Sequence, residues 1–193
     1  MNQHIDMKNE PVRPLSMHPQ RFALWLFIVS IVMIFAAMTS AYIVKKSDGD
    51  WVDIILPQSF WLNTIVLVAS SVTMHMAYIA AKRNNLNLVK IAMTITTILG
   101  LSFLVGQYVS WGELAAMDVH FEGKPAGSFI YVFTGLHGFH LISGVVFLII
   151  VLVATFRFKV HSKSMNLIGM CATYWHFLDG LWVYLFIFLL LNH

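Results

Sequence analysis

The chain has 193 residues, of which 59% are hydrophobic and only 11% are charged. A soluble domain of this length carries about 25% charged residues. This chain therefore has more apolar surface than its own globule can bury, and lipid must cover the remainder. The net charge of +3 comes mostly from basic residues outside the apolar runs and indicates anionic lipid headgroups, not nucleic acid, as its partner.

Five apolar runs are long enough to cross a hydrocarbon core of about 30 Å. They cover residues 22–44, 60–81, 91–111, 129–155 and 167–191. Each must be a helix, because no backbone polar group can stay unpaired in hydrocarbon. The sequence thus predicts an all-α polytopic membrane protein with one five-helix domain, residues 22–193. Residues 1–21 are polar, lack the pattern of a signal peptide, and form the expected N-terminal segment.

The loops predict the orientation of these spans. Nine of the twelve Lys and Arg residues fall on the side of the N-terminus and three on the other. The nine are Lys8, Arg13, Arg21, Lys82, Arg83, Lys90, Arg157, Lys159 and Lys163, and the three are Lys45, Lys46 and Lys124. By the positive-inside rule, the N-terminus is cytoplasmic and His193 is periplasmic.

An ionisable or strongly polar residue inside a span is a candidate functional residue. The candidates are His75, Gln107, His137, His140, His176 and Asp179. His176 and Asp179 are three apart and share a helix face, so Asp179 can accept a hydrogen bond from the imidazole. The pair is either a proton site or partner contact, or a satisfied pair that holds helices in register. We favour the second, because polar contacts commonly join membrane helices. Trp175 and Trp182 share another stripe.

The fourth span carries two histidines three residues apart, together with several glycines. His137 and His140 are expected to share a face, and Gly135, Gly138 and Gly144 to let another backbone come close. A di-iron site would need glutamates inside the spans, and no span contains one. We therefore expect a close-packed helix seam with the imidazoles hydrogen-bonded across it.

Other cofactor sites are also disfavoured. His75, His140 and His176 could serve as axial haem ligands on facing helices, but nothing in their spacing requires a haem. Met74, His75 and Met76 offer soft copper ligands, yet consecutive helical residues point in different directions. No catalytic residue, metal or other cofactor is expected in this chain. The absence of proline from all five spans disfavours a transporter with broken helices.

Several motifs together resemble a known family, subunit III of the haem-copper terminal oxidases. They are YWHFLD at 174–179 followed by Trp182, TGLHGFH at 134–140, SSVTMH at 70–75, and HP at 18–19 followed by LWLF at 24–27. They resemble the family's YWHFVD-x-x-W, TGFHGxH, SSxTxH and HP…LWxF motifs. The resemblance covers nearly the whole chain, in family order, and is to the five-helix form of the family.

The resemblance implies a multi-pass subunit of the bacterial inner membrane with no redox centre of its own. It would pack on subunit I, which holds the haems and copper, join the other oxidase subunits and a larger respiratory supercomplex, and bind phospholipid. The complex, a cytochrome c or quinol oxidase, would reduce oxygen to water and pump protons. The residues expected in helix packing, subunit contact or lipid binding are His75, Gln107, Gly135, His137, Gly138, His140, Trp175, His176, Asp179 and Trp182. Those expected to contact headgroups are Lys82, Arg83 and Lys90.

Two positions depart from the family pattern. Ile31 stands where the first span usually has a glutamate, and Ser110 replaces a glutamate of the third span. Glu113, one turn beyond Ser110, is expected at the outer interface. The electron donor stays open, although the acidic stretches 48–53 and 118–122 suit a basic cytochrome c. Two alternatives also stay open, namely an independent haem-binding electron carrier and a small proton-translocating protein.

Overall fold

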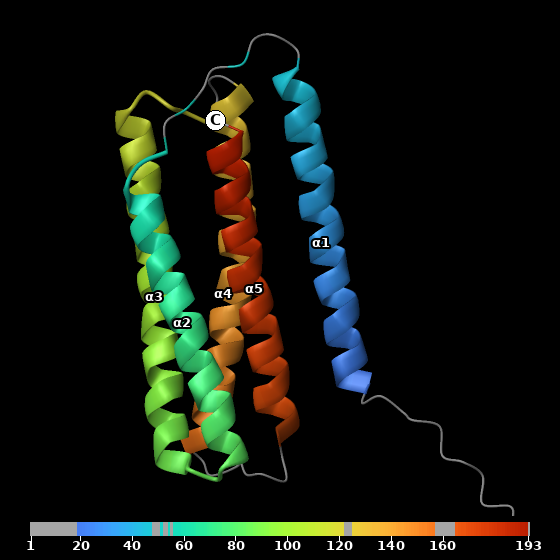
Figure 1. The fold of residues 1–193 in the computed structure, drawn as a ribbon, viewed down its shortest axis with the longest axis vertical. Helices are drawn as coiled ribbons and strands as arrows, with labels where there is room; N and C mark the ends of the chain where they lie inside the picture. The colour runs from blue at the N-terminus through green and yellow to red at the C-terminus, as the bar shows by residue number, and fades with distance from the viewer. Residues whose placement is uncertain are drawn as a thin grey trace, which may run out of the picture.

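The computed structural model describes residues 19–47, 51, 54, 56–121, 125–156 and 165–192. Within these residues the chain forms five α-helices and no strand (Figure 1). They are α1 (Pro19–Lys46), α2 (Ser59–Lys82), α3 (Leu86–Ala116), α4 (Pro125–Phe156) and α5 (Met165–Leu191). All five are long and apolar enough to span a membrane, which confirms the predicted fold class.

Some residues used in the sequence analysis lie outside the described part. They are Lys8, Arg13, His18, Asp48, Asp50, Asp53, Glu122, Lys124, Arg157, Lys159, Lys163 and His193. We call the end of the bundle where α1, α3 and α5 begin the predicted cytoplasmic end, and the other the predicted periplasmic end.

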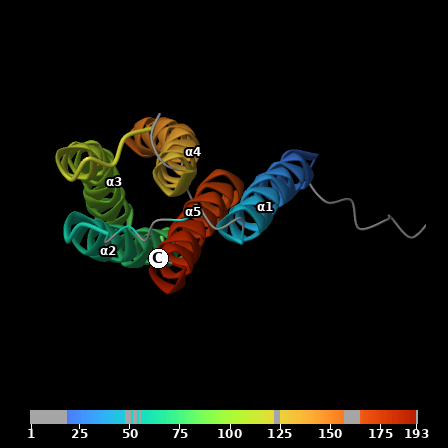
Figure 2. The same cartoon turned by 90° about the horizontal axis from the view of Figure 1, so that it is seen from above.

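Helices α2, α3, α4 and α5 surround a common core, and α1 lies at the edge of the molecule (Figure 2). The most extensive pairs are α2 with α3 and α3 with α4, while α1 packs on α4 and α5. In the same view α5 lies between α1 and α2. Figure 1 shows α1 running alongside α5 at the edge of the bundle.

A tight turn makes α2 and α3 antiparallel neighbours. Asn84 adopts the left-handed conformation, with φ of 53°, which asparagine tolerates better than most residues. The backbone N–H of Asn85 donates to Ala80 O at 3.0 Å and closes α2. Its side chain accepts a hydrogen bond from the N–H of Leu88 at 3.3 Å and caps α3. This cap starts α3 before the predicted apolar run, because capping depends on local polar chemistry and not on hydropathy.

The core is built around the side chains of Trp175 and Trp182, which are both 1% exposed. Two glycines make room for Trp175. A Cβ added to Gly100 of α3 would lie 2.7 Å from Cη2 of Trp175, and one added to Gly144 of α4 would lie 3.3 Å from Cζ3. The ring of Trp182 stacks on Phe60 and meets the edge of Phe103, with centroids 6.0 and 4.9 Å away. The packing of α2, α3, α4 and α5 therefore depends on the positions of these two indole rings.

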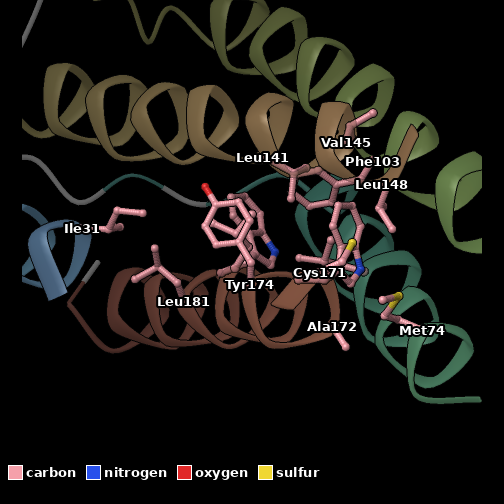
Figure 3. Packing of buried hydrophobic residues seen from close by; sticks show 14 of the residues in the cluster. Ile31, Met74, Phe103, Leu141, Val145, Leu148, Cys171, Ala172, Tyr174 and Leu181 are labelled. Carbon is pink, nitrogen blue, oxygen red and sulfur yellow. The ribbon is translucent and has the colours of Figure 1, made fainter. Parts of the chain in front are cut away.

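Helix α1 joins this core from Ile28 onward, where all five of its buried residues lie. In Figure 3, Ile31 of α1 lies toward Leu181 of α5. The hydroxyl of Tyr42 donates to Asn192 O at 2.8 Å. The Tyr42 ring also meets the ring of Phe188 edge-on, with centroids 5.1 Å apart. These contacts hold α1 between Ile28 and Tyr42, while the side chains of its first two turns are exposed or half-buried.

Because the Trp175 indole is rigid and buried, Gly100→Ala should overpack the core. Gly112→Ala on the same helix is the matched control, since nothing lies within 4 Å of its added Cβ. Alanine stabilises a helix by about 1 kcal/mol relative to glycine, and this gain applies at both sites. Overpacking occurs only at Gly100 and costs about 1–3 kcal/mol. We expect Gly100→Ala to be about 1–3 kcal/mol less stable than Gly112→Ala in detergent-micelle unfolding. Equal stabilities would contradict this account of the core.

Candidate functional site

Three residues of the YWHFLD segment and its flank join α5 to α2 by hydrogen bonds. The indole N–H of Trp175 donates to Ser70 Oγ at 3.0 Å, and that of Trp182 donates to Thr64 Oγ1 at 3.1 Å. Between them, Nδ1 of His176 and Oγ of Ser71 are hydrogen-bonded at 2.7 Å. We call this set of contacts the α2–α5 seam. Such bonds stabilise a membrane helix pair by about 0.6 kcal/mol each, and up to about 1.7.

Sequence reasoning identified the α5 half of this seam and missed the α2 half. The acceptors of Trp182 and Trp175 on α2 are Thr64 and Ser70, which are six residues apart, while the two tryptophans are seven apart on α5. Because the two helices run in opposite directions, these similar spacings allow both bonds to form. Small hydroxyl residues on α2 at nearly the spacing of the tryptophans are the signal that could have found the seam.

The predicted His176–Asp179 hydrogen bond is wrong. His176 turns its Nδ1 to Ser71 instead. Asp179 is only 4% exposed, and neither carboxylate oxygen has a hydrogen-bond partner among the described residues. Ser71 also lies beside Asp179, and its hydroxyl can accept from Nδ1–H of His176 while its own hydrogen points toward the carboxyl. No described residue has hydrogen-bond geometry to the carboxyl oxygens or to Nε2 of His176.

His75 lies beside the seam on the outer surface of α2. Its ring centroid is 5.9 Å from that of His176. Met74 is fully buried and Met76 is 48% exposed, so the triplet diverges as the helical spacing predicts. Among the residues that the structure describes, no group of three or more His, Cys, Asp or Glu side chains could hold a metal ion.

His137 and His140 do not form the predicted bonded seam, because they face different helices. His137 is fully buried between Phe103 and Trp182, with centroids 6.0 and 5.1 Å away. Neither of its ring nitrogens has a hydrogen-bond partner in the described chain. His140 faces α1, 6.0 Å from the Phe35 ring, and its Nδ1 bonds Leu136 O of its own helix at 2.8 Å.

Gln107 of α3 is a second buried side chain with both polar atoms unpartnered among the described residues. It lies one turn from Trp111, whose indole N–H donates to Thr134 Oγ1 of α4 at 2.9 Å. His137 lies one turn from Thr134 on the facing helix. The α3–α4 contact therefore combines one satisfied hydrogen bond, which sequence reasoning missed, with two unsatisfied polar side chains.

The glycines of α4 differ in what they contact. A Cβ on Gly135 would meet Trp111 at an ordinary 3.7 Å, and one on Gly138 would have nothing within 4 Å. The expectation that Gly138 admits a neighbouring backbone is thus wrong for this chain, because Gly138 is buried but no atom of another helix comes that close to it. Gly144 is the close contact, since a Cβ added there would lie 2.8 Å from Leu178 Cδ1. Gly100 of α3, which serves the same indole, was not predicted.

The two positions that depart from the family pattern are both buried in the structure. Ile31 is 1% exposed and belongs to the apolar core. Ser110 donates to Gly106 O at 2.9 Å and accepts from Asn63 Nδ2 of α2 at 3.2 Å. Glu113 does not reach back to this level, because its carboxylate accepts a hydrogen bond from the hydroxyl of Ser59, at the start of α2, at 2.6 Å.

Basic residues and two hollows gather at the predicted cytoplasmic end. Lys82 Nζ lies 4.6 Å from the Tyr78 ring centroid, and Lys90 Nζ lies 5.5 Å from that of Phe156. Arg83, at the C-cap of α2, is exposed. One hollow of about 350 Å³ lies between α1, α4 and α5, and one of about 260 Å³ lies between α1, α2 and α5. Both lie beside the first turns of α1.

These observations define a class of protein. It is a polytopic membrane protein in which tryptophan, histidine and hydroxyl side chains join helices. Its hollows lie between α1 and the rest of the bundle.

Comparison with known proteins identifies the family. The sequence model described as "Cytochrome c oxidase subunit III" matches residues 14–192. The chain is 27% identical over 176 residues to cytochrome bo(3) ubiquinol oxidase subunit 3 of Buchnera aphidicola, covering 89% of this chain and 93% of that protein. It is 32% identical over 185 residues to cytochrome c oxidase subunit 3 of Rattus norvegicus, covering 90% and 70%. For the Corynebacterium diphtheriae subunit 3 the identity is 28%, covering 84% and 82%.

The chain belongs to the cytochrome c oxidase subunit III family. It is a structural subunit of a respiratory terminal oxidase, a multi-pass protein of the bacterial inner membrane, and it associates with the other subunits of that oxidoreductase complex.

Replacing Ser70 by alanine should weaken the α2–α5 seam. The indole N–H of Trp175 would be left buried without an acceptor, which costs about 1–2 kcal/mol. Ser102→Ala is the control, because Ser102 is exposed and bonds only Ile98 O of its own helix. We expect unfolding in micelles to show the loss for Ser70→Ala and a change below about 0.5 kcal/mol for Ser102→Ala. A Ser70→Ala protein as stable as the control would show that the seam does not hold these helices.

Proposed function

We propose that this chain is the non-catalytic subunit that packs on the haem-copper subunit I of its oxidase and stabilises it. The observation that carries the proposal is the use of the motif residues. Trp175, His176 and Trp182 are each hydrogen-bonded to α2, so the side chains that resemble the family signature serve helix contacts. The haems and copper of the complex belong to partner subunits in this proposal, and oxygen reduction takes place there.

We further propose that the chain binds phospholipid at its cytoplasmic end. The larger hollow is lined by apolar side chains, among them Leu24, Phe27 and Phe147, which suit an acyl chain. Arg21 lines the smaller hollow, and Lys82 follows on the neighbouring end of α2. A basic cluster of this kind attracts anionic headgroups by about 1 kcal/mol per Lys or Arg.

This placement also supports the predicted orientation. Arg21, Lys82, Arg83 and Lys90 all lie at the end of the bundle where α1 begins, and basic residues favour the cytoplasmic side. The electron donor, cytochrome c or quinol, docks on another subunit in this proposal. The other hypotheses, an independent haem carrier and a proton-translocating protein, have no observation in the described residues that favours them.

Co-purification tests the main proposal. A tagged chain extracted in mild detergent should bring down a larger membrane subunit with haem absorbance, because the two pack together in the membrane. The measurement is mass spectrometry of the purified subunits together with the visible spectrum. Recovery of the chain only as a free protein without haem, under conditions that keep the oxidase active, would contradict the proposal.

Charge removal tests the lipid proposal. The triple variant Lys82→Gln, Arg83→Gln, Lys90→Gln should retain less anionic phospholipid, with a loss of about 1 kcal/mol per charge. Lipid extracted from the purified complex can be quantified by mass spectrometry. The control variant Lys45→Gln, Lys46→Gln removes charge from the opposite end of α1. The same lipid loss in both variants would mean that the cytoplasmic cluster has no special role.

A further inference from the structure

The contact between α3 and α4 contains two buried polar side chains that the bundle does not satisfy. The two helices lie side by side (Figure 2). Gln107 of α3 is 3% exposed, and His137 of α4 is fully buried. Both polar atoms of the Gln107 amide and both ring nitrogens of His137 lack a hydrogen-bond partner among the described residues. His137 lies about 18 Å along α4 from its first residue, at 1.5 Å per residue. An unpaired polar group this deep in the membrane is costly.

Two contacts show how α3 and α4 are aligned. The indole of Trp111 on α3 bonds Thr134 on α4. Toward the cytoplasmic end, a Cβ added to Gly100 of α3 would lie 3.4 Å from Cγ2 of Val145 on α4. The helices are therefore antiparallel, and each step back along α3 is matched by an equal step forward along α4. Gln107, four residues before Trp111, thus lies opposite the position four residues after Thr134.

That position is Gly138, and no side chain of another helix fills the space beside it. Gly138 is buried, yet no atom of another helix lies within 4 Å of a Cβ added there. A water oxygen lies about 2.7–3.2 Å from its hydrogen-bond partners, so this space has room for one. His137 precedes Gly138 and contacts the ring of Phe103, with centroids 6.0 Å apart. Phe103 is one turn from Gln107 on α3, so the imidazole lies near the level of the amide.

We propose that a water molecule is bound beside Gly138 and is hydrogen-bonded to Gln107 and His137. Buried water typically makes about three hydrogen bonds to polar groups that the protein leaves unpaired. An amide offers both donors and an acceptor, and a neutral imidazole offers one of each, so water can pair with either side chain in any orientation. The bound water joins α3 to α4 one turn from the bond between Trp111 and Thr134. It also gives Gly138 a role, because a side chain at this position would take the place of the water.

A cryo-EM map of the purified oxidase that contains the full chain tests the site directly, at a resolution that shows other internal waters. A separate density peak should lie beside Gly138, within about 2.7–3.2 Å of an amide atom of Gln107 and of a ring nitrogen of His137. The same map of the Gln107→Leu protein should lack this peak, because leucine has a similar size and no polar atom. The proposal is overturned if the unmodified protein shows no peak here, or if the peak persists in Gln107→Leu.

A pair of variants of nearly equal shape tests the site in solution. Gly138→Val and Gly138→Thr fill the space alike, since both side chains are β-branched. Only threonine supplies a hydroxyl that can bond Gln107 or His137 in place of the water. We expect the full chain in micelles to unfold at a temperature about 2–4 °C higher for Gly138→Thr than for Gly138→Val.

The matched control is the same pair of substitutions at Gly112, where nothing lies within 4 Å of an added Cβ and no unpaired polar group is involved. Gly112→Thr should show no such gain over Gly112→Val. An unfolding temperature of Gly138→Val equal to or above that of Gly138→Thr would show that the space is apolar and would overturn the proposal. If neither Gly138 variant folds, the maps of the unmodified and Gln107→Leu proteins decide.

Discussion

The structure depends on one constraint, that a polar group within hydrocarbon needs a partner. Most of the chain meets it inside its helices, and the α2–α5 seam meets it between helices, through the bonds of Trp175, His176 and Trp182 to α2. The same constraint explains the two departures from the family pattern. A charged residue at the centre of a membrane helix costs about 2.5–3.5 kcal/mol, and here Ile31 joins the apolar core while Ser110 is satisfied by neighbouring groups.

Two sets of buried polar groups do not meet the constraint among the described residues. Asp179 and Nε2 of His176 lie beside α2, and Gln107 and His137 lie in the interior between α3 and α4. Burial of a polar group without a hydrogen-bond partner costs free energy, so, in protein contacts alone, these four side chains make the core less stable than an apolar core of the same shape.

The fold was largely predictable from the sequence, because apolar run length reports directly on membrane helices. The pairwise contacts were less so. The i, i+3 spacing placed His176 near Asp179 and His137 near His140, yet each histidine turned to a different neighbour. Rotamers and facing helices, such as Ser71 opposite His176, decide among local partners, and hydropathy carries no information about them. The same reason applies to Gly100, whose role follows from the position of an indole on another helix.

The central claim is that the imidazoles inside the membrane serve the packing of the helix bundle and that electrons travel through other subunits. The most direct measurement is the visible absorption spectrum of this chain after it has been separated from the haem-bearing subunits and purified in detergent. The account predicts no Soret band. A Soret band that disappears on substitution of His137, His140 or His176 would contradict it.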